Sequence, residues 1–305
     1  MTRPCKIGVQ LPEVEWAVTW PELIDMAQTA EAVGFDSIWL GDHLLYDMPD
    51  GSHRGPWEVW TSLAALAVAT TTVEIGPLVA CTSFHAPAML AKQAATVDAI
   101  SGGRLVLGLG AGWNAREYTA YGFPYDNRVS RFEEAFTIIR TLLTDGHIDF
   151  HGTYYDADDC VLEPRSSRPG GPPLMLGSAS PRMLSIALPY IQSWNIWWSV
   201  FGNTAHGFAE VVANVEAACV AIGRDPATVD ATAAVFVQMQ SGGGRVMGSD
   251  GAAHCAPITG SAAAIAEQLA AFAAAGASHL QLVVDPITKA SIESLGEVLT
   301  LLDAM

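Results

Sequence analysis

The chain has 305 residues, half of them apolar, and its 32 acidic and 15 basic side chains give a formal net charge of −17 at pH 7. This acidity argues against nucleic acid or an anionic membrane as a partner, because both are bound by basic surfaces. The length and apolar content suffice for a large core, and an α/β barrel of this size commonly forms one domain.

The cysteines and the N-terminal residues indicate the cellular compartment of the protein. Five cysteines are scattered without a C-x-x-C pair, which indicates reduced thiols rather than a disulfide framework. The chain starts with a strand-like segment instead of a charged and then apolar leader, and no uncharged apolar run is long enough to span a bilayer. We therefore expect a cytoplasmic protein without a membrane segment.

Strand and helix patterns alternate along the chain. Short, nearly continuous apolar runs predict buried strands at residues 5–11, 37–42, 73–80, 104–110, 173–178, 193–198, 231–239 and 279–285. Helical periodicity separates them at residues 20–33, 57–70, 87–100, 131–144, 181–190, 205–222, 262–275 and 288–302. Eight such units predict a (β/α)8 TIM barrel, one domain over residues 1–305. A doubly wound open sheet is the alternative, but it rarely has eight even units.

Long connections interrupt this alternation. Residues 147–163, with Gly152 at the turn, predict a small hairpin inserted before the fifth strand. Residues 241–260 form a long Gly- and Ala-rich loop after the seventh strand. Together with the 44–56 loop, this one lies on the carboxyl face of a barrel, where active sites form.

Residues just past the carboxyl end of each barrel strand surround the active-site mouth. Here they are Asp42 and His43, Thr82 and Ser83, and residues 110–114, 177–180 and 195–198. One histidine with small polar groups and tryptophans suits a flat ring with polar edges. The hydrolase patterns G-x-S-x-G and H-E-x-x-H are not in the sequence, and no carboxylates are paired at strand ends.

The pair Asp42-His43 indicates acid–base chemistry. His43 can donate a hydrogen bond or a proton at the reactive edge of a ring, with Asp42 orienting the imidazole or binding the ring itself. The alternative is a pair that only closes a turn. A metal site built from this pair and Asp47, Asp50 and His53 is disfavoured, because these residues lack ligand-like spacing.

Two small-residue segments indicate contact with a cofactor. Gly110 and Gly112 allow a ring or a ribityl chain to lie close to the backbone, although a plain tight turn is equally compatible. The dinucleotide fingerprint is rejected, because Trp113 replaces its third glycine. In residues 177–181, Ser180 can cap a helix that starts at Pro181, so the free N–H groups and the Ser178 hydroxyl form a phosphate site or merely a capped turn.

Aromatic residues can wall an apolar substrate cavity or belong to the core, and the core is favoured for any single one. They are Trp57, Trp60, Trp113, Trp194, Trp197 and Trp198. Glu58, at the start of the second helix, is interpreted as an acid that complements the helix dipole rather than as a substrate-side acid.

The order of these motifs resembles the luciferase-like monooxygenase superfamily, and within it the oxidoreductases that use the deazaflavin coenzyme F420. The likeness extends from Ile7 to about Leu302. It rests on GFDSIWLGDH (34–43), LAKQAATVDAISGGRLVLGLGAGWNAREYTAYG (90–122), RFEEA (131–135), PPLMLGSASPRML (172–184) and SWN (193–195). The stretch G-W-N-x-x-E-Y with S-G-G-R-L before it is the most specific part.

The resemblance implies a barrel with a flavin-like ring across its mouth and His43 as the catalytic residue. The cofactor-binding residues that it implies are Asp42 and His43 at the reactive side of the ring, Leu78 and Val79 behind it, Gly110, Gly112 and Asn114 along the sugar-like chain, and Gly177, Ser178 and Ala179 around the phosphate. It also implies a non-prolyl cis peptide at Leu78–Val79. Trp113 stands where the glucose-6-phosphate dehydrogenase branch has an acid, and lysines are few, so a phosphorylated sugar substrate is not expected.

We therefore expect an oxidoreductase that moves a hydride between coenzyme F420 and a small organic substrate. An FMN-dependent monooxygenase on the same fold is the alternative. A non-catalytic flavin-binding barrel is disfavoured, because Asp42, His43, Asn114 and Ser178 are all retained. Barrels of this family commonly pair through helices, and the small residues 62–67 suit close helix approach, so a homodimer is expected.

Overall fold

The computed structural model describes residues 3–243 and 255–305, and at its centre a parallel sheet closes on itself. The strands are β1 (Lys6–Gln10), β2 (Ser37–Leu40), β5 (Glu74–Pro77), β6 (Ala80–Cys81), β7 (Leu107–Gly110), β10 (Leu174–Leu176), β11 (Ser193–Trp197), β12 (Asp230–Gln238) and β13 (His279–Asp285). Their order is β5-β2-β1-β13-β12-β11-β10-β7-β6. Because β5 and β6 are two halves of the predicted third strand, the two edges of this sheet belong to one strand, and the (β/α)8 prediction is confirmed.

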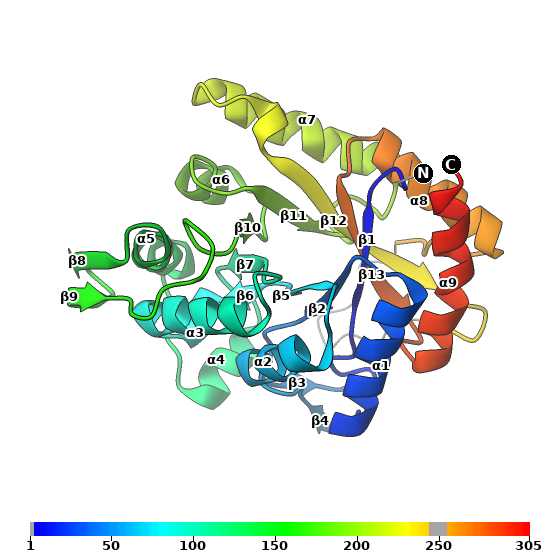
Figure 1. Cartoon of the computed structure of the whole chain (residues 1–305), viewed down its shortest axis with the longest axis horizontal. Coiled ribbons are helices and arrows are strands. Elements are labelled where there is room, and N and C mark those ends of the chain that lie inside the picture. Colours follow the sequence, from blue (N-terminus) through cyan, green and yellow to red (C-terminus); the bar gives the residue numbers. More distant parts are fainter. Residues whose placement is uncertain (1–2, 244–254) are drawn as a thin grey trace.

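Helices encircle the barrel in chain order, as Figure 1 shows. They are α1 (Trp20–Val33), α2 (Val59–Ala69), α3 (Pro87–Ile100), α5 (Arg128–Asp145), α6 (Pro181–Ala187), α7 (Ala205–Ala221), α8 (Ala262–Ala274) and α9 (Lys289–Asp303). Each matches a predicted helix, although α6 ends three residues earlier than expected. A short helix, α4 (Ala115–Tyr121), was not predicted. It follows β7 directly, so its polar first turn belongs to the barrel mouth.

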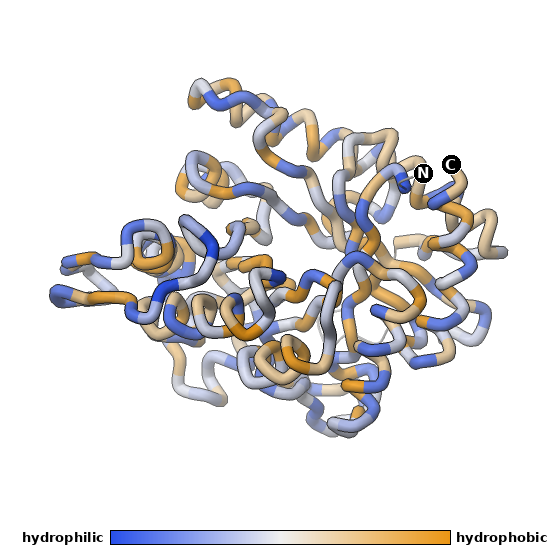
Figure 2. The backbone as a smooth tube through the Cα atoms, in the orientation of Figure 1, coloured by the Kyte–Doolittle hydropathy of each residue, from blue (hydrophilic) through white to orange (hydrophobic). Residues whose placement is uncertain are grey.

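The helix starts follow from local capping chemistry. The hydroxyls of Thr204, Ser261 and Thr288 accept hydrogen bonds from backbone N–H groups in the first turns of α7, α8 and α9. Such caps satisfy N–H groups that have no partner within the helix. In Figure 2, apolar stretches run through the central strands, while the helices alternate between apolar and hydrophilic positions. The core therefore fills the space between the barrel and its ring of helices.

The insertions flank the barrel. The predicted hairpin is present as β8 (His147–His151) paired antiparallel with β9 (Asp156–Val161), and it projects beside α5 (Figure 1). A two-residue pair, β3 (Tyr46–Asp47) and β4 (His53–Arg54), shapes the loop after β2. Short 3-10 turns lie at η1 (Thr82–Phe84) and η2 (Pro226–Thr228). The predicted 241–260 loop lies largely outside the described residues.

The small residues of α2 do not form the surface that the sequence suggested. Ser62, Leu63, Leu66 and Ala67 are buried against the barrel of their own chain, because they fall on the inner face of the helix. The outer face instead exposes Val68. None of the described helices is both long and apolar enough to cross a membrane, and all five cysteines are free thiols.

Candidate active site

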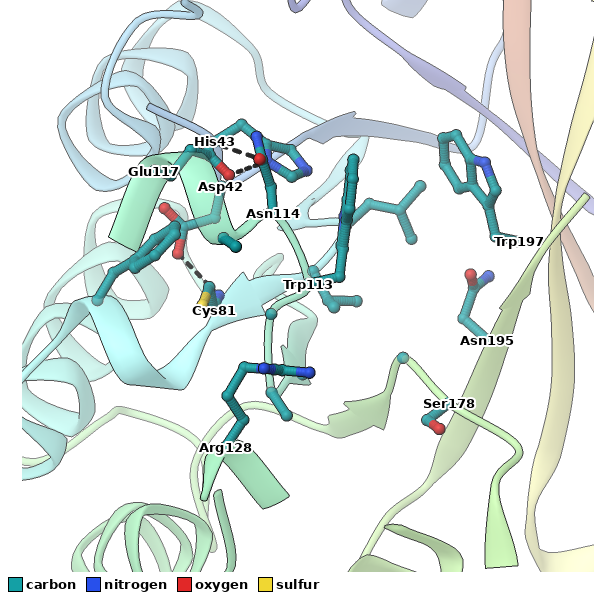
Figure 3. A pocket seen from close by; sticks show the side chains of 18 of the residues that line it. Asp42, His43, Cys81, Trp113, Asn114, Glu117, Arg128, Ser178, Asn195 and Trp197 are labelled. Atoms are coloured by element: carbon teal, nitrogen blue, oxygen red, sulfur yellow. Dashed lines mark hydrogen bonds and ion pairs between the residues drawn. The ribbon is translucent and has the colours of Figure 1, made fainter. Parts of the chain in front are cut away.

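A cavity of about 650 Å³ opens at the carboxyl ends of the barrel strands (Figure 3). This volume is within the range of small-molecule and cofactor sites. It is lined by the predicted residues Asp42, His43, Leu78, Val79, Gly110, Gly112, Asn114, Gly177 and Ser178, whereas Ala179 is not part of the lining. The structure thus brings these residues from the ends of four different strands, β2, β5, β7 and β10, to one place.

His43 is held at the cavity wall by a carboxylate from α4. Its Nδ1 lies 3.0 Å from Oε2 of Glu117, whose side chain is 1% exposed. The same carboxylate accepts the backbone N–H groups of Leu44 and Leu45 at 2.5 and 3.1 Å. With Nδ1 and its ring orientation fixed by Glu117, His43 can offer Nε2 to a ligand. Figure 3 shows this pair beside Trp113.

The surroundings of His43 favour its protonated form. Burial disfavours the charge, but the hydrogen bond to Glu117 and the charges of Glu13 and Asp42 outweigh it, so the pKa of His43 is raised above its ordinary 6.5. The imidazole is therefore suited to donating a proton or a hydrogen bond near neutral pH.

Asp42 does not orient His43, which corrects one interpretation of the sequence. Its Oδ2 accepts hydrogen bonds from the backbone N–H of Cys81 at 2.9 Å and from Nε2 of His85 at 2.8 Å. Consecutive side chains at the end of a strand point in different directions, so Asp42 and His43 find separate partners. Asp42 thereby ties the end of β2 to β6.

The glycines of the mouth make room for Val79. The Leu78–Val79 peptide is cis, as the resemblance implied. A Cβ at Gly177 would lie 2.5 Å from Cγ2 of Val79, and one at Gly110 would lie 2.7 Å from the same atom. A side chain at either position would therefore collide with Val79. Gly112 has φ +73° and its Cβ would meet the hydroxyl of Tyr118 at 2.1 Å, so packing within the protein already requires glycine there.

Asn114 lines the cavity and also begins α4. Its Oδ1 accepts the Arg116 N–H at 3.2 Å, and its Nδ2 donates to the Leu45 carbonyl at 3.1 Å. These bonds connect the start of α4 to the loop after β2, the two segments that hold Glu117 and His43. Asn114 therefore has a structural role in addition to any contact with a ligand.

The segment after β10 starts a helix as predicted, with Ser180 in the N-cap position and Pro181 as the first helical residue. The Ser180 side chain makes no cap bond, and the Ser178 hydroxyl instead accepts the N–H of Ser180 itself at 3.2 Å, just before the helix. Arg128 lines the same cavity, and its guanidinium lies 3.8 Å from the centre of the Tyr125 ring. Figure 3 shows its side chain directed into the space that Ser178 also borders. A cation and a helix start in one cavity favour an anionic group there.

Aromatic and amide side chains complete the walls. Trp113, Trp197 and Trp198 line the cavity, whereas Trp60 and Trp194 belong to the core and Trp57 is exposed. Asn195 donates from Nδ2 to Thr232 at 2.8 Å and to Gln281 at 2.7 Å. Its side chain is directed toward the cavity in Figure 3. Trp198 is 2% exposed, and its Nε1 makes no hydrogen bond to the described residues. A buried donor of this kind favours a ligand with acceptor atoms.

Several residues that line the cavity, and His85 behind Asp42, were missed by sequence reasoning. Glu117 lies within the G-W-N-x-x-E-Y motif, so the motif contained the signal, but only the fold brings it to His43. Glu13, Arg128 and His85 follow no pattern that marks them. Glu58 caps α2 through hydrogen bonds from the N–H groups of Trp60 and Thr61, which agrees with its interpretation as a helix-start acid.

The fold and the cavity define a (β/α)8 barrel with a ligand site at the carboxyl ends of its strands. The chain belongs to the luciferase-like monooxygenase family, whose profile matches residues 6–242. The family assignment made from the sequence is therefore confirmed.

Curated relatives include oxidoreductases that use F420. The chain is 35% identical over 153 residues to an F420-dependent glucose-6-phosphate dehydrogenase of Amycolatopsis mediterranei, which covers 48% of this chain and 45% of the relative. It is 31% identical over 235 residues to an F420-dependent hydroxymycolic acid dehydrogenase of Mycobacterium tuberculosis, covering 75% and 62%. The matches thus span about half of the relatives' length.

Solved structures show the same fold at low identity. An F420-dependent secondary alcohol dehydrogenase in complex with an F420–acetone adduct superposes with a TM-score of 0.79 at 20% identity, covering 98% of both chains. A riboflavin lyase with modified FMN also reaches 0.79, at 16% identity, covering 99% of this chain and 92% of the other. Both F420- and FMN-containing barrels therefore share this architecture.

Proposed function

We propose that this chain acts as a single-domain oxidoreductase that transfers a hydride between coenzyme F420 and a small organic substrate. The observation that carries the proposal is the Glu117–His43 pair, which fixes an imidazole of raised pKa at the wall of the large cavity in the barrel mouth. The F420-dependent relatives support the choice of cofactor.

The residues of the cavity fit such a cofactor. Gly110 and Gly177 leave the backbone bare around Val79, and aromatic side chains stand on the opposite walls. The Nε1 of Trp198, which has no partner among residues 3–243 and 255–305, supplies a donor, and Ser178 with Arg128 supplies a place for a phosphate. When bound, a deazaflavin accepts or gives a hydride at a ring carbon.

Each group of the chain then has a defined task. His43, oriented by Glu117, would donate a proton to the substrate oxygen when a carbonyl compound is reduced, and its neutral form would accept the hydroxyl proton when an alcohol is oxidised. Trp113 and Trp197 exclude water from this part of the cavity. His43 is the residue for which we propose a catalytic role.

Turnover tests this proposal. Purified protein with F420 and a panel of small alcohols, or with reduced F420 and the matching carbonyl compounds, should change the absorbance of the oxidised cofactor. His43→Ala should reduce the rate about a hundredfold or more, the scale of a positioned acid–base group, with a small change in thermal stability. A variant that keeps its turnover within a few fold but melts at a much lower temperature would show that His43 is structural.

An FMN-dependent monooxygenase is the second candidate, because an FMN-containing barrel has the same architecture. The two candidates differ in their reaction with oxygen, so oxygen consumption by the reduced, FMN-loaded protein would favour the second.

We further propose that the chain is a cytoplasmic homodimer that binds neither nucleic acid nor membrane. Exposed apolar side chains on and beside neighbouring helices support the dimer: Trp57 is 51% exposed before α2, Val68 is 76% exposed on α2, and Met89 is 55% exposed on α3. Burial of such side chains between subunits is favourable. Light scattering should give twice the mass of one chain, and the mass of a single chain would rule the dimer out.

A further inference from the structure

Two histidine–carboxylate pairs border the cavity, one with its histidine toward the cavity and the other with its carboxylate toward it. In one, His43 faces the cavity and Glu117 is buried behind it, with Nδ1 and Oε2 3.0 Å apart. In the other, Asp42 lines the cavity and His85 stands behind it, with Nε2 and Oδ2 2.8 Å apart. Because Asp42 and His43 are consecutive, the two pairs present one imidazole and one carboxylate side by side.

The second pair is nearly closed to solvent. The side chains of Asp42 and His85 are 3% and 14% exposed. Oδ2 also accepts the Cys81 N–H, so both hydrogen bonds go to the same oxygen, and Oδ1 makes none with the described residues. The carboxylate is therefore fixed from behind, with one oxygen available to a ligand.

His85 is surrounded by acidic groups. Asp42 contacts it from the end of β2, Glu58 acts on it electrostatically from the start of α2, and the Trp60 ring packs edge-on at 6.4 Å. His43 faces Glu117 from α4, Glu13 from the end of β1 and Asp42. The Nε2 donor of His85 thus lies on the far side of the one carboxylate that is shared by both environments.

We propose that His85 is a positioning residue that fixes Asp42 with one oxygen toward the cavity and offsets its charge beside His43. The inference deepens the proposed function, in which His43 acts on the substrate, but its test needs no cofactor. An Asp42 that lacks this donor stabilises the protonated form of His43 more strongly than an Asp42 whose charge is partly offset by the Nε2–H of His85. His85 thus controls, through Asp42, the pH at which His43 gives up its proton.

The pKa of His43, measured by NMR of 13C-labelled histidine in the cofactor-free protein, tests this inference. His85→Leu removes the N–H donor of Asp42 but keeps a side chain in its place, so it should raise the pKa of His43 by about half a unit or more. Asp42→Asn should lower it. The matched control is His147→Leu, since His147 also contacts an aspartate through Nε2 at 2.8 Å but is exposed on the β8–β9 hairpin. It should leave the pKa of His43 unchanged.

The double variant Asp42→Asn/His85→Leu distinguishes a positioning role from a role in folding. Removing the carboxylate together with its donor leaves no unpaired buried carboxylate, so this protein is expected to fold even if His85→Leu alone does not. Its His43 should titrate as in Asp42→Asn, because His85 acts through Asp42. A His43 pKa that is the same in wild type and His85→Leu, or that differs by half a unit between Asp42→Asn and the double variant, would overturn the proposal. If the pKa shifts appear but F420 does not bind, the proposed function fails while the pairing stands.

Discussion

Replacing Glu117 by glutamine isolates the contact that fixes His43. The carboxylate accepts three N–H groups, from His43, Leu44 and Leu45, and its side chain is 1% exposed. Glutamine offers one carbonyl oxygen and turns an NH2 group toward at least one of these donors. Losing a charge-assisted hydrogen bond and leaving a buried donor unsatisfied should lower the free energy of unfolding by about 2–4 kcal/mol.

The pH dependence of this loss has a defined sign. The pKa of His43 is raised above 6.5 in the folded protein, so its pairing with Glu117 stabilises the fold most below that value. This contribution disappears as the pH rises through the raised folded pKa. The difference in unfolding free energy between wild type and Glu117→Gln should therefore be larger at about pH 5.5 than at about pH 9.

Urea unfolding at both pH values, with NMR titration of His43, measures the two effects. The pKa of His43 should fall in Glu117→Gln, because its partner is no longer ionised. A difference in stability that is the same at both pH values, together with an unchanged pKa of His43, would refute the reasoning.

Two further substitutions test the segment after β10, which holds Ser178 and Gly177. Ser178→Asp places a negative charge just before α6 and should weaken cofactor binding about tenfold. Ser185→Asp, at an exposed position later on the same helix, is the control and should leave the affinity unchanged. Equal affinities of the two variants would show that the phosphate does not bind at this segment. Gly177→Ala should destabilise the fold by about 1–3 kcal/mol, because its Cβ would lie 2.5 Å from Val79, and Val79→Ala in the same chain should restore part of the loss. Gly243→Ala, whose new Cβ would have no atom of the described residues within 4 Å, is the control for this pair, and an equal loss there would contradict the packing argument.

The barrel could be predicted because its signals are local and repeated. Apolar runs of strand length alternate with helical periodicity, and the cap at Ser180 and Pro181 can be recognised from residue types alone. The partners of Asp42 and His43 could not be predicted in this way. Glu117 and His85 are 74 and 43 residues away from them, and only closure of the barrel brings these side chains together.

The glycines at the barrel mouth and the residues of α2 show a second limit of prediction from the sequence. Gly110 was interpreted as space for a cofactor and Gly177 as part of a phosphate site, but the structure shows that Val79 also requires both glycines. Residues 62–67 were interpreted as a surface, although most of them are on the buried side of α2. The residue type shows that a position holds a small or apolar side chain, but only the packing in the structure shows which neighbouring residue requires that side chain.

Side-by-side titration of the purified protein with F420 and with FMN, followed by fluorescence, tests the central claim most directly. We expect F420 to bind with a Kd of about 1 μM or lower, and FMN to bind at least about tenfold more weakly. Tighter binding of FMN by tenfold or more, or no binding of F420, would contradict the account.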